Sequence, residues 1–379
     1  MSLGGPEGGP EGATKYAVFV PSMAGGGAER VMATVANQLA LLGYEVDLIL
    51  ASRSGPYLRE IVSQVSIVDL GASRTARATI PLAKYLREHR PAAVLSAMPH
   101  ANMTAILANK LAGSPSRVVA SERDVVKPVP KRIGPRFLRW LTSRIYRNAD
   151  LVIAVSDGVR QDVLRELVPD PAKVRTIYNP VDLDEIRARA AEPVSHPWLK
   201  DRTVPMFLAV GRLERVKGFD ILLKAFAEVR GTNPSRLVII GEGSLRSDLE
   251  SQARDLGIAE FVDLPGFQTN PFAWMARCDV FVLSSRGEGL PNALIQAMAC
   301  GARVVSTECE HGPAEILAQG RWGQLVPVED VMALSTAMRS ALDSPDSPNV
   351  LERANDFSQE ELVGQYLQAL KSVEEGAKQ

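Results

Sequence analysis

Runs of apolar, often β-branched residues alternate with amphipathic stretches along almost the whole chain. Short runs joined by helical patterns of about ten to fifteen residues are typical of parallel sheets. The runs are continuously apolar, which predicts strands covered by helices on both faces. In the first half, strands are expected at 16–21, 45–50, 65–68, 92–97, 117–121, 151–155 and 174–177, with helices that include 28–42 and 101–111.

The second half of the chain repeats this pattern. Strands are expected at 206–210, 237–240, 262–264, 280–283 and 304–306, with helices near 219–229 and 292–299. A proline-containing segment, 179–205, separates the two arrays. We therefore predict an α/β protein of two Rossmann-like domains, whose parallel sheets face each other across a cleft. The expected boundaries are a disordered tail or tag at 1–14, domains at 15–180 and 181–355, and a C-terminal helix at 356–379 that can pack back on the first domain.

Composition narrows the class of protein only slightly. Apolar residues make up 46 % and charged residues 23 % of the 379 residues, as in ordinary globular proteins. The three cysteines have neither the number nor the spacing of a disulfide framework, which favours a reducing compartment. Because no apolar run is long enough to span a bilayer and no signal-peptide pattern opens the chain, we expect a cytoplasmic protein.

Charge is distributed unevenly between the two halves. Residues 1–190 contain 25 lysine and arginine residues against 18 acidic ones, whereas the remainder contains 18 against 26. Seven basic residues and no acidic one lie within 127–147, interleaved with large apolar side chains. This segment is either a solvated helix face packed on its domain or a surface for an anionic membrane or lipid-linked acceptor.

The first candidate site follows the first expected strand, at Ser22–Arg30. Its glycines let the backbone approach a ligand closely, and the following helix offers unpaired N–H groups to an anion or a sugar hydroxyl. The spacing is not GxGxxG, and Ala51–Arg53 stands where a dinucleotide-binding fold has an acidic residue. A tight strand-to-helix turn is the alternative.

A second candidate site follows the strand at 206–210. Arg212 and Lys217 lie five residues apart in a loop that leads into a helix. An arginine fork and a lysine point charge can together hold a diphosphate. Two solvated surface cations are the alternative.

A third candidate site lies in 284–301, where a strand leads into a loop and then a helix. Glu288 is suited to sugar hydroxyls, and the amides of Gly289–Asn292 at the helix N-terminus can hold a phosphate. Gln296 lies one turn into the helix, within reach of a ribose. A capped helix with an exposed carboxylate is the alternative.

Together these segments resemble the family 4 glycosyltransferases, retaining enzymes of the two-Rossmann-domain GT-B architecture. The resemblance covers residues 15–345, and the subgroup that builds lipopolysaccharide, capsule and related glycans is the most similar. It rests on the loop at Gly25–Gly27, "YNPVD" at 178–182, "VGRL…KG" at 210–218, "GEGSLR" at 241–246, "LPGF" at 264–267, "EGLPNALIQAMACG" at 288–301 and "HGPAEIL" at 311–317.

The resemblance implies roles for matching residues. Arg212 and Lys217 would hold the donor diphosphate, Glu288 would contact the donor sugar, and His100 matches less tightly a histidine that the family places near the sugar. The donor-binding set implied is Gly26, Gly27, Gly211, Gly266, Phe267, Gly289, Leu290, Pro291, Asn292 and Gln296. Within it, Gly266 and Phe267 would frame the base, which is usually uracil.

One residue departs from the family pattern. Gln296 replaces the second glutamate of the Glu-x7-Glu motif, which accepts hydrogen bonds from the ribose. A glutamine carbonyl still accepts but lacks charge assistance, so we expect weaker nucleotide affinity without loss of the reaction.

No metal or other cofactor is expected. Asp182-Leu183-Asp184 spells the metal-binding DxD of another glycosyltransferase architecture, but it opens a helix, so we predict N-capping. The four histidines show no metal spacing.

We expect a retaining, metal-independent glycosyltransferase that uses a UDP-sugar, such as an N-acetylhexosamine or hexose donor. The second domain would bind the donor and the first a glycan or lipid-linked acceptor, with peripheral membrane association through 127–147 and no nucleic-acid partner. A nucleotide-sugar epimerase of the same architecture and a non-catalytic glycosyltransferase-like subunit are the alternatives.

Overall fold

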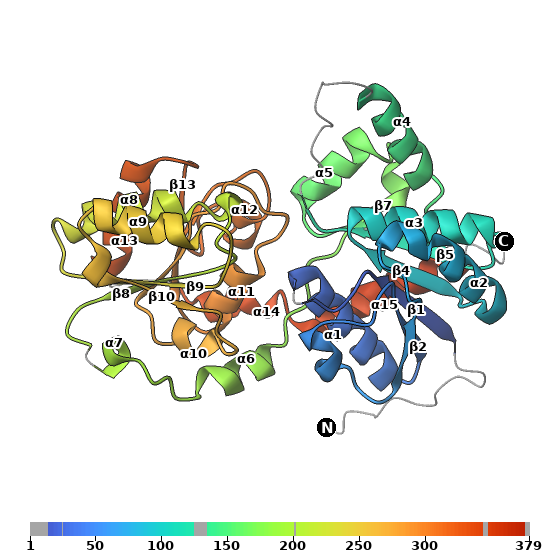
Figure 1. The fold of residues 1–379 in the computed structure, drawn as a ribbon, viewed down its shortest axis with the longest axis horizontal. Helices are drawn as coiled ribbons and strands as arrows, with labels where there is room; N and C mark the ends of the chain where they lie inside the picture. The colour runs from blue at the N-terminus through green and yellow to red at the C-terminus, as the bar shows by residue number, and fades with distance from the viewer. Residues whose placement is uncertain (1–13, 25, 125–134, 201, 344–347, 376–379) are drawn as a thin grey trace. The chain divides into compact units, whose positions relative to one another are not determined.

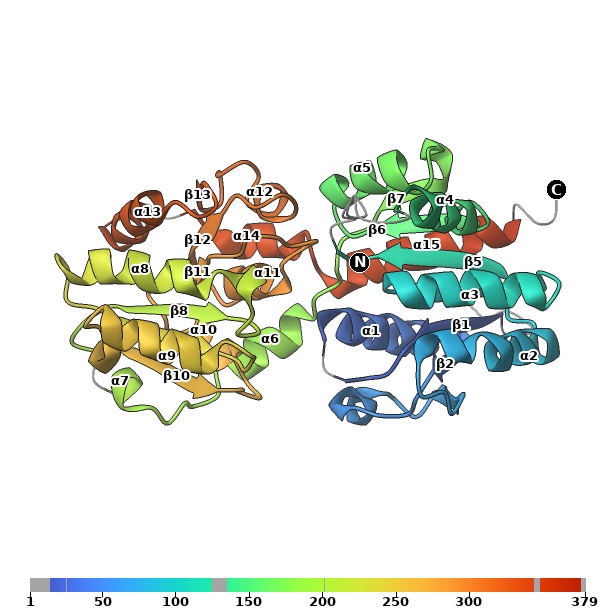
Figure 2. The same cartoon turned by 45° about the horizontal axis from the view of Figure 1, so that its top comes forward.

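A computed structural model describes residues 14–24, 26–124, 135–200, 202–343 and 348–375, with only the backbone for 135–139. The chain divides into two compact units. The first comprises residues up to 155, residues 159–180 and residues from 360 onward, whereas the second comprises 156–158 and 181–359. Figures 1 and 2 show both units as sheets flanked by helices.

The first unit is built on a parallel seven-stranded sheet of order β3-β2-β1-β4-β5-β6-β7. Its strands are β1 Lys15–Val20, β2 Glu45–Leu50, β3 Val65–Asp69, β4 Ala93–Ala97, β5 Arg117–Glu122, β6 Leu151–Ala154 and β7 Val174–Thr176. Its helices are α1 Gly27–Leu41, α2 Thr79–His89, α3 Pro99–Leu111, α4 Pro135–Tyr146, α5 Asp157–Glu166 and α15 Gln359–Glu375, with 3-10 turns at Pro56–Glu60, Thr75–Ala78 and Pro171–Lys173.

The second unit repeats this topology in a parallel six-stranded sheet of order β10-β9-β8-β11-β12-β13. Its strands are β8 Met206–Val210, β9 Arg236–Ile240, β10 Val262–Gly266, β11 Val280–Leu283, β12 Arg303–Thr307 and β13 Gln324–Val326. Its helices are α6 Leu183–Ala190, α7 Pro197–Lys200, α8 Phe219–Arg230, α9 Arg246–Asp255, α10 Phe272–Met275, α11 Asn292–Ala299, α12 Pro313–Ile316, α13 Val331–Asp343 and α14 Val350–Asn355, with 3-10 turns η4 Arg215–Lys217 and η5 Ala259–Phe261.

Helices cover both sheets because the strands are apolar along their length. Strands β4, β6 and β11 are buried at every residue, as the continuous apolar runs predicted. In the first unit, α1 and the C-terminal helix α15 pack on one face of the sheet. Figure 1 shows α15, in red, among the blue elements of the first unit. Tyr366 and Leu370 of α15 are buried in the same core as Val18 of β1.

The predicted fold class is confirmed, and so is the capping role of Asp182. Its Oδ1 accepts a hydrogen bond from the Glu185 N–H at 2.8 Å, at the start of α6. Its Oδ2 accepts a second from Gln359 Nε2 at 3.0 Å. Strand β13 was not predicted, because it begins at the polar Gln324 and Pro327 follows it directly, so no continuous apolar run marks it.

Candidate active site

The candidate residues gather where the strand order of each sheet reverses. In the first sheet this point lies between β1 and β4, and in the second between β8 and β11. Loops after the carboxyl ends of parallel strands diverge at such a point and leave a crevice in which these folds bind ligands. The loop of Gly26 and Gly27 follows β1, His100 follows β4, the Arg212–Lys217 loop follows β8, and Glu288 follows β11.

The loop after β8 is held against the end of β9. The Gly211 N–H donates to the Ile240 carbonyl at 2.9 Å, and the Leu213 N–H donates to Glu242 at 2.9 Å. Gly241 is required here, because a Cβ at this residue would lie 1.9 Å from the Gly211 oxygen. Arg212 is exposed on this braced loop, so its guanidinium can reach a ligand at the strand end.

Lys217 and Glu288, from the loops after β8 and β11, form an ion pair. Lys217 Nζ lies 2.6 Å from Glu288 Oε1. Ser285 Oγ also donates to Glu288 Oε1, at 2.6 Å. Glu288 is 9 % exposed, so its charge is balanced inside the loop cluster. An ammonium has three N–H groups, which leaves Lys217 able to donate to a phosphate while it stays close to Glu288.

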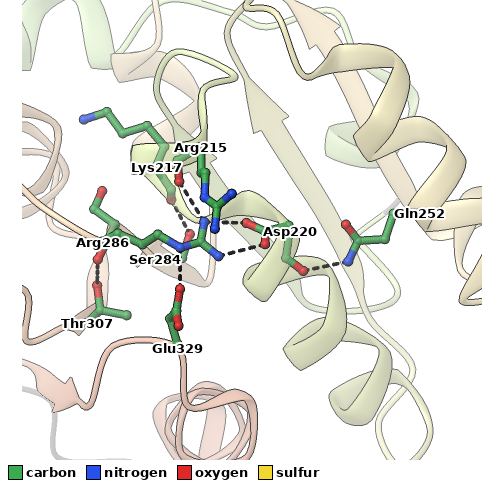
Figure 3. Close-up of polar contacts among 9 residues, drawn as sticks. Arg215, Lys217, Asp220, Gln252, Ser284, Arg286, Thr307 and Glu329 are labelled. Carbon is green, nitrogen blue, oxygen red and sulfur yellow. Dashed lines mark hydrogen bonds and ion pairs between the residues drawn. The ribbon is translucent and has the colours of Figure 1, made fainter.

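Lys217 also belongs to a hydrogen-bonded network of residues 215–220, 284–286 and 329. Figure 3 draws this network without Glu288. Arg286 binds both carboxylate oxygens of Asp220, at 2.7 and 2.8 Å. Arg286 holds the pKa of Asp220 below its usual range through these bonds. The sequence singled out neither residue, since a loop arginine and a helix aspartate also fit an ordinary solvated surface.

The Gly289–Asn292 turn is buried at Gly289, Leu290 and Pro291 before α11 begins. It rests against Gly312, whose φ of +88° suits only glycine. A Cβ on Gly312 would meet the Pro291 ring at 2.6 Å and the Gly289 oxygen at 3.1 Å. Gln296 lies on α11, one turn beyond Asn292, and is half-buried.

Gly266 ends β10 and Phe267 follows it, at the carboxyl end of this strand. Gly266 has a φ of +81°, and a Cβ there would come within 2.7 Å of the Glu242 carboxylate. Phe267 is 73 % exposed, an unusual position for a large aromatic ring, and leaves a flat apolar face for a planar group. Arg246 binds both oxygens of Glu242, at 3.1 and 3.0 Å, and fixes that carboxylate beside Gly266.

In the first unit, Gly26 is the N-cap of α1 and Gly27 its first residue, both exposed. Gly25 lies outside the described residues. A Cβ on Gly26 would lie 2.3 Å from Glu29 Oε2, so a carboxylate of the chain itself stands at this helix start. Its negative charge opposes an anion there and favours a sugar hydroxyl.

His100 is exposed in the first turn of α3, and the backbone before it is strained. Met98 has φ of +79° and ψ of 141°, a conformation that residues with a side chain rarely adopt. The Met98 carbonyl accepts from the Asn102 N–H at 2.9 Å, and its N–H donates to Ser121 at 3.3 Å. The turn that presents His100 is therefore imposed by the structure around it.

A buried polar network lies beneath this turn. Asn102 Nδ2 donates to Glu122 Oε1 at 2.8 Å and to the Ser121 carbonyl at 2.9 Å, and Oδ1 of Asn102 accepts from Ser96 Oγ at 2.8 Å. The Tyr146 hydroxyl donates to Glu122. Burial raises the pKa of Glu122 to about 7, although both donors favour its charged form.

A buried thiol accompanies the Lys217–Glu288 pair. Cys309 follows β12, and burial together with the Glu288 charge raises its pKa to about 12. The thiol is therefore protonated at neutral pH. Among the described residues, no group of three or more His, Cys, Asp or Glu side chains is arranged to hold a metal ion.

Two parallel, Rossmann-like sheets, flanked by helices, define the class of the protein as GT-B. Solved structures of this class have the same fold. The Anabaena protein HepE in complex with UDP-glucose superposes with a TM-score of 0.79 at 18 % identity, over 94 % of this chain and 99 % of that one. The lipopolysaccharide outer core galactosyltransferase WaaB superposes with a TM-score of 0.71 at 21 % identity, over 95 % and 99 %.

Sequence comparison gives the family. The family described as Glycosyltransferase Family 4 matches residues 25–185, and Glycosyl transferases group 1 matches 204–344. The chain is 30 % identical, over 87 % of its length and 90 % of the relative's, to the Campylobacter jejuni N-acetylgalactosamine-N,N'-diacetylbacillosaminyl-diphospho-undecaprenol 4-alpha-N-acetylgalactosaminyltransferase. The chain therefore belongs to the GT-B group 1 glycosyltransferases, and it is a glycosyltransferase of the lipopolysaccharide and glycan-building kind.

None of the helices in the described ranges combines the length and the apolar character needed to cross a membrane.

Proposed function

We propose that this glycosyltransferase moves an N-acetylhexosamine or hexose from a UDP-sugar to a lipid-linked glycan, with retention of the anomeric configuration. The observation that carries the proposal is the Lys217–Glu288 pair at the switch point of β8 and β11, with Arg212 in the same loop as Lys217. In a nucleotide sugar the diphosphate is bonded directly to the sugar. A lysine that binds the diphosphate and a glutamate that binds a sugar hydroxyl should therefore lie in contact, as Lys217 and Glu288 do. The relative from Campylobacter jejuni, by its name, transfers N-acetylgalactosamine to a diphospho-undecaprenol glycan.

In this mechanism, the bond from the anomeric carbon to the diphosphate breaks and a bond to the acceptor hydroxyl oxygen forms on the same face. The acceptor proton passes to the departing phosphate oxygen. Negative charge grows on the diphosphate, where Arg212, Lys217 and the amides at the start of α11 can stabilise it. Glu288 binds a sugar hydroxyl, and Phe267 stacks on the base.

A transfer assay tests the proposal. The protein is incubated with UDP-N-acetylgalactosamine, UDP-N-acetylglucosamine or UDP-glucose and an undecaprenyl-diphosphate-linked oligosaccharide, with and without EDTA. Extension of the glycan with an α-linkage by NMR, unaffected by EDTA, is expected. Epimerised donor in the absence of acceptor would favour an epimerase, and no turnover with any donor would favour a non-catalytic subunit.

Replacing Gln296 with glutamate is expected to tighten UDP binding modestly. A carboxylate on α11 accepts a charge-assisted hydrogen bond from the ribose, about twice as strong as a neutral one. Calorimetry on the wild type and Gln296→Glu measures the change. Equal or weaker affinity in the variant would show that this side chain does not contact the ribose.

We also propose a membrane surface at 127–147, of which 127–134 lie outside the described residues. In the described part of α4, Trp140 is 54 % exposed, with the Arg144 guanidinium 5.5 Å from its ring centre. Leu107 and Leu111 of the neighbouring helix α3 are also exposed. Exposed apolar rings and chains among cations are typical of surfaces that bind anionic lipid.

Vesicles that contain anionic lipid are expected to capture the protein at low salt and release it at high salt. Each cation near such a bilayer contributes about 1 kcal/mol, and salt screens this attraction. Sedimentation should show that capture is lost, with UDP binding intact, when serine replaces Lys131, Arg132, Arg136 and Arg139. A control of equal charge change in the second unit should retain capture, with serine at the exposed residues Lys200, Lys224, Arg254 and Arg321. If the wild type does not bind the vesicles at low salt, the segment 127–147 is a solvated helix face and not a membrane surface.

A further inference from the structure

The Arg286 side chain connects four segments of the second unit. Its Nη1 and Nη2 bind the two carboxylate oxygens of Asp220, in the first turn of α8, at 2.7 and 2.8 Å. Its Nε donates to Glu329 Oε1 at 2.8 Å, and Nη1 also donates to the Arg215 carbonyl at 2.7 Å. Figure 3 shows the guanidinium between these groups. Arg286 itself lies two residues before Glu288.

Three consecutive carbonyls of the turn that carries Lys217 receive hydrogen bonds from residues 284–286. The Arg215 carbonyl accepts from the Arg286 side chain, and the Val216 carbonyl accepts from the Arg286 backbone N–H at 2.7 Å. The Lys217 carbonyl accepts from Ser284 Oγ at 2.9 Å. The backbone that presents Lys217 is thus fixed by the loop that presents Glu288.

Close backbone contact makes the same connection just after Lys217. Gly218 has a φ of +65°, and a Cβ there would lie 2.0 Å from the Ser284 carbonyl oxygen. Thr307 Oγ1 donates to the Ser285 carbonyl at 2.6 Å and braces the other side of the loop. These bonds restrict both loops to the observed conformation.

We propose that Arg286 is a positioning residue, held by Asp220, that fixes Lys217 against Glu288 so that the pair meets the donor diphosphate and sugar. This inference rests on the proposed function of that pair. Arg286 does not itself contact the donor and acts through the Lys217 turn. Displacement of a catalytic group by about 1 Å can cost about a hundredfold in rate, which is the scale of the effect.

Lysine cannot replace this arginine. A lysine ammonium is a single point charge, whereas the guanidinium fork binds Asp220 through two nitrogens and still reaches Glu329 and the Arg215 carbonyl. Arg286→Lys keeps the charge but loses the geometry. It is therefore expected to lower kcat by about tenfold, and Arg286→Ala by about a hundredfold. Asp220→Asn keeps the shape of the carboxylate but removes its charge, and it should also lower kcat.

A double-mutant cycle with Lys217→Ala distinguishes positioning from general destabilisation. If Arg286 acts through Lys217, adding Arg286→Lys to Lys217→Ala should lower kcat by less than about twofold, because coupled residues are not additive. The inference would be overturned if the double variant lost the product of the two single-variant factors in kcat. It would also be overturned if Arg286→Lys had a normal kcat. Normal turnover in Lys217→Ala alone would instead overturn the proposed function and the inference with it.

Arg277→Lys is the matched control. Arg277 donates to the Ala190 and Ala273 carbonyls, each at 2.8 Å, in the same unit but beside α6 and α10. The same chemical change there should lower the melting temperature without altering kcat or the KM for the donor. If Arg286→Lys behaves like Arg277→Lys, with a lower melting temperature and unchanged kinetics, Arg286 is only structural.

Discussion

Lys217→Ala and Arg212→Ala are each expected to lower turnover by about a hundredfold or more while the fold stays intact. Removing one preorganised hydrogen-bond donor that stabilises the charge developing in the transition state typically lowers kcat by about a hundred- to a thousandfold. Both residues lie in the loop after β8, outside the cores of the sheet, so their truncation removes charge rather than packing. Steady-state kinetics at saturating acceptor measures kcat, and circular dichroism checks the fold.

Arg215→Ala provides the matched control for both variants. Arg215 is an exposed cation in the same 3-10 turn, and the described network uses its backbone carbonyl only. Its truncation should change kcat by less than about threefold, since surface charges are screened. Near-normal kcat in both Lys217→Ala and Arg212→Ala would place the diphosphate elsewhere.

Glu122→Gln is expected to stabilise the protein at alkaline pH and leave it unchanged in acid. Burial raises the folded-state pKa of this carboxyl from an ordinary 4.5 to about 7, with a smaller contribution from Asp124. The folded chain therefore binds a proton more tightly than the unfolded chain. The contribution of Glu122 to stability is therefore most favourable below pH 4.5 and is lost as the pH rises towards 7. This loss is on the order of 3 kcal/mol, and an amide, which does not ionise, avoids it.

Unfolding in urea, followed for the two proteins between pH 4.5 and 8, measures this difference. The curves should coincide in acid and separate as the pH rises, with the variant the more stable protein above pH 7. Glu88→Gln, at an exposed residue of α2, should follow the wild type throughout. Equal stability of Glu122→Gln and the wild type at every pH would show that Glu122 stays ionised in the folded chain.

Periodicity and motif order were sufficient to predict both sheets and the loops that follow β1, β4, β8 and β11. Helix α11 was predicted with its observed bounds, because the Gly–Leu–Pro turn and the following apolar pattern mark its start. Strand β13 was missed, because Gln324 and Pro327 leave only Leu325 and Val326 as an apolar pair. Strand order in such folds brings only the loops at the ends of central strands together. The roles of single residues on these loops came from the family resemblance and stay predictions.

Side-chain pairing could not be predicted from the sequence. Lys217 and Glu288 are separated by 71 residues, and a motif assigns each a separate part of the donor without stating that they touch. Arg286 lay within the candidate segment 284–301, but its proposed role depends on Asp220 and on two backbone carbonyls of another loop. Glu122 ends an apolar strand and resembles an exposed boundary residue, whereas its burial depends on Tyr146 of a distant helix.

The return of α15 to the first unit determines the order in which a nascent chain can complete its two cores. A ribosome delivers β1 to β7 first, then the whole second unit, and only afterwards Tyr366 and Leu370, which fill the core around Val18. The second unit can therefore close its sheet during synthesis while the first still exposes the face that α15 covers. Such an exposed apolar face is a site for chaperones and for aggregation. The unit that emerges first is the last to finish folding.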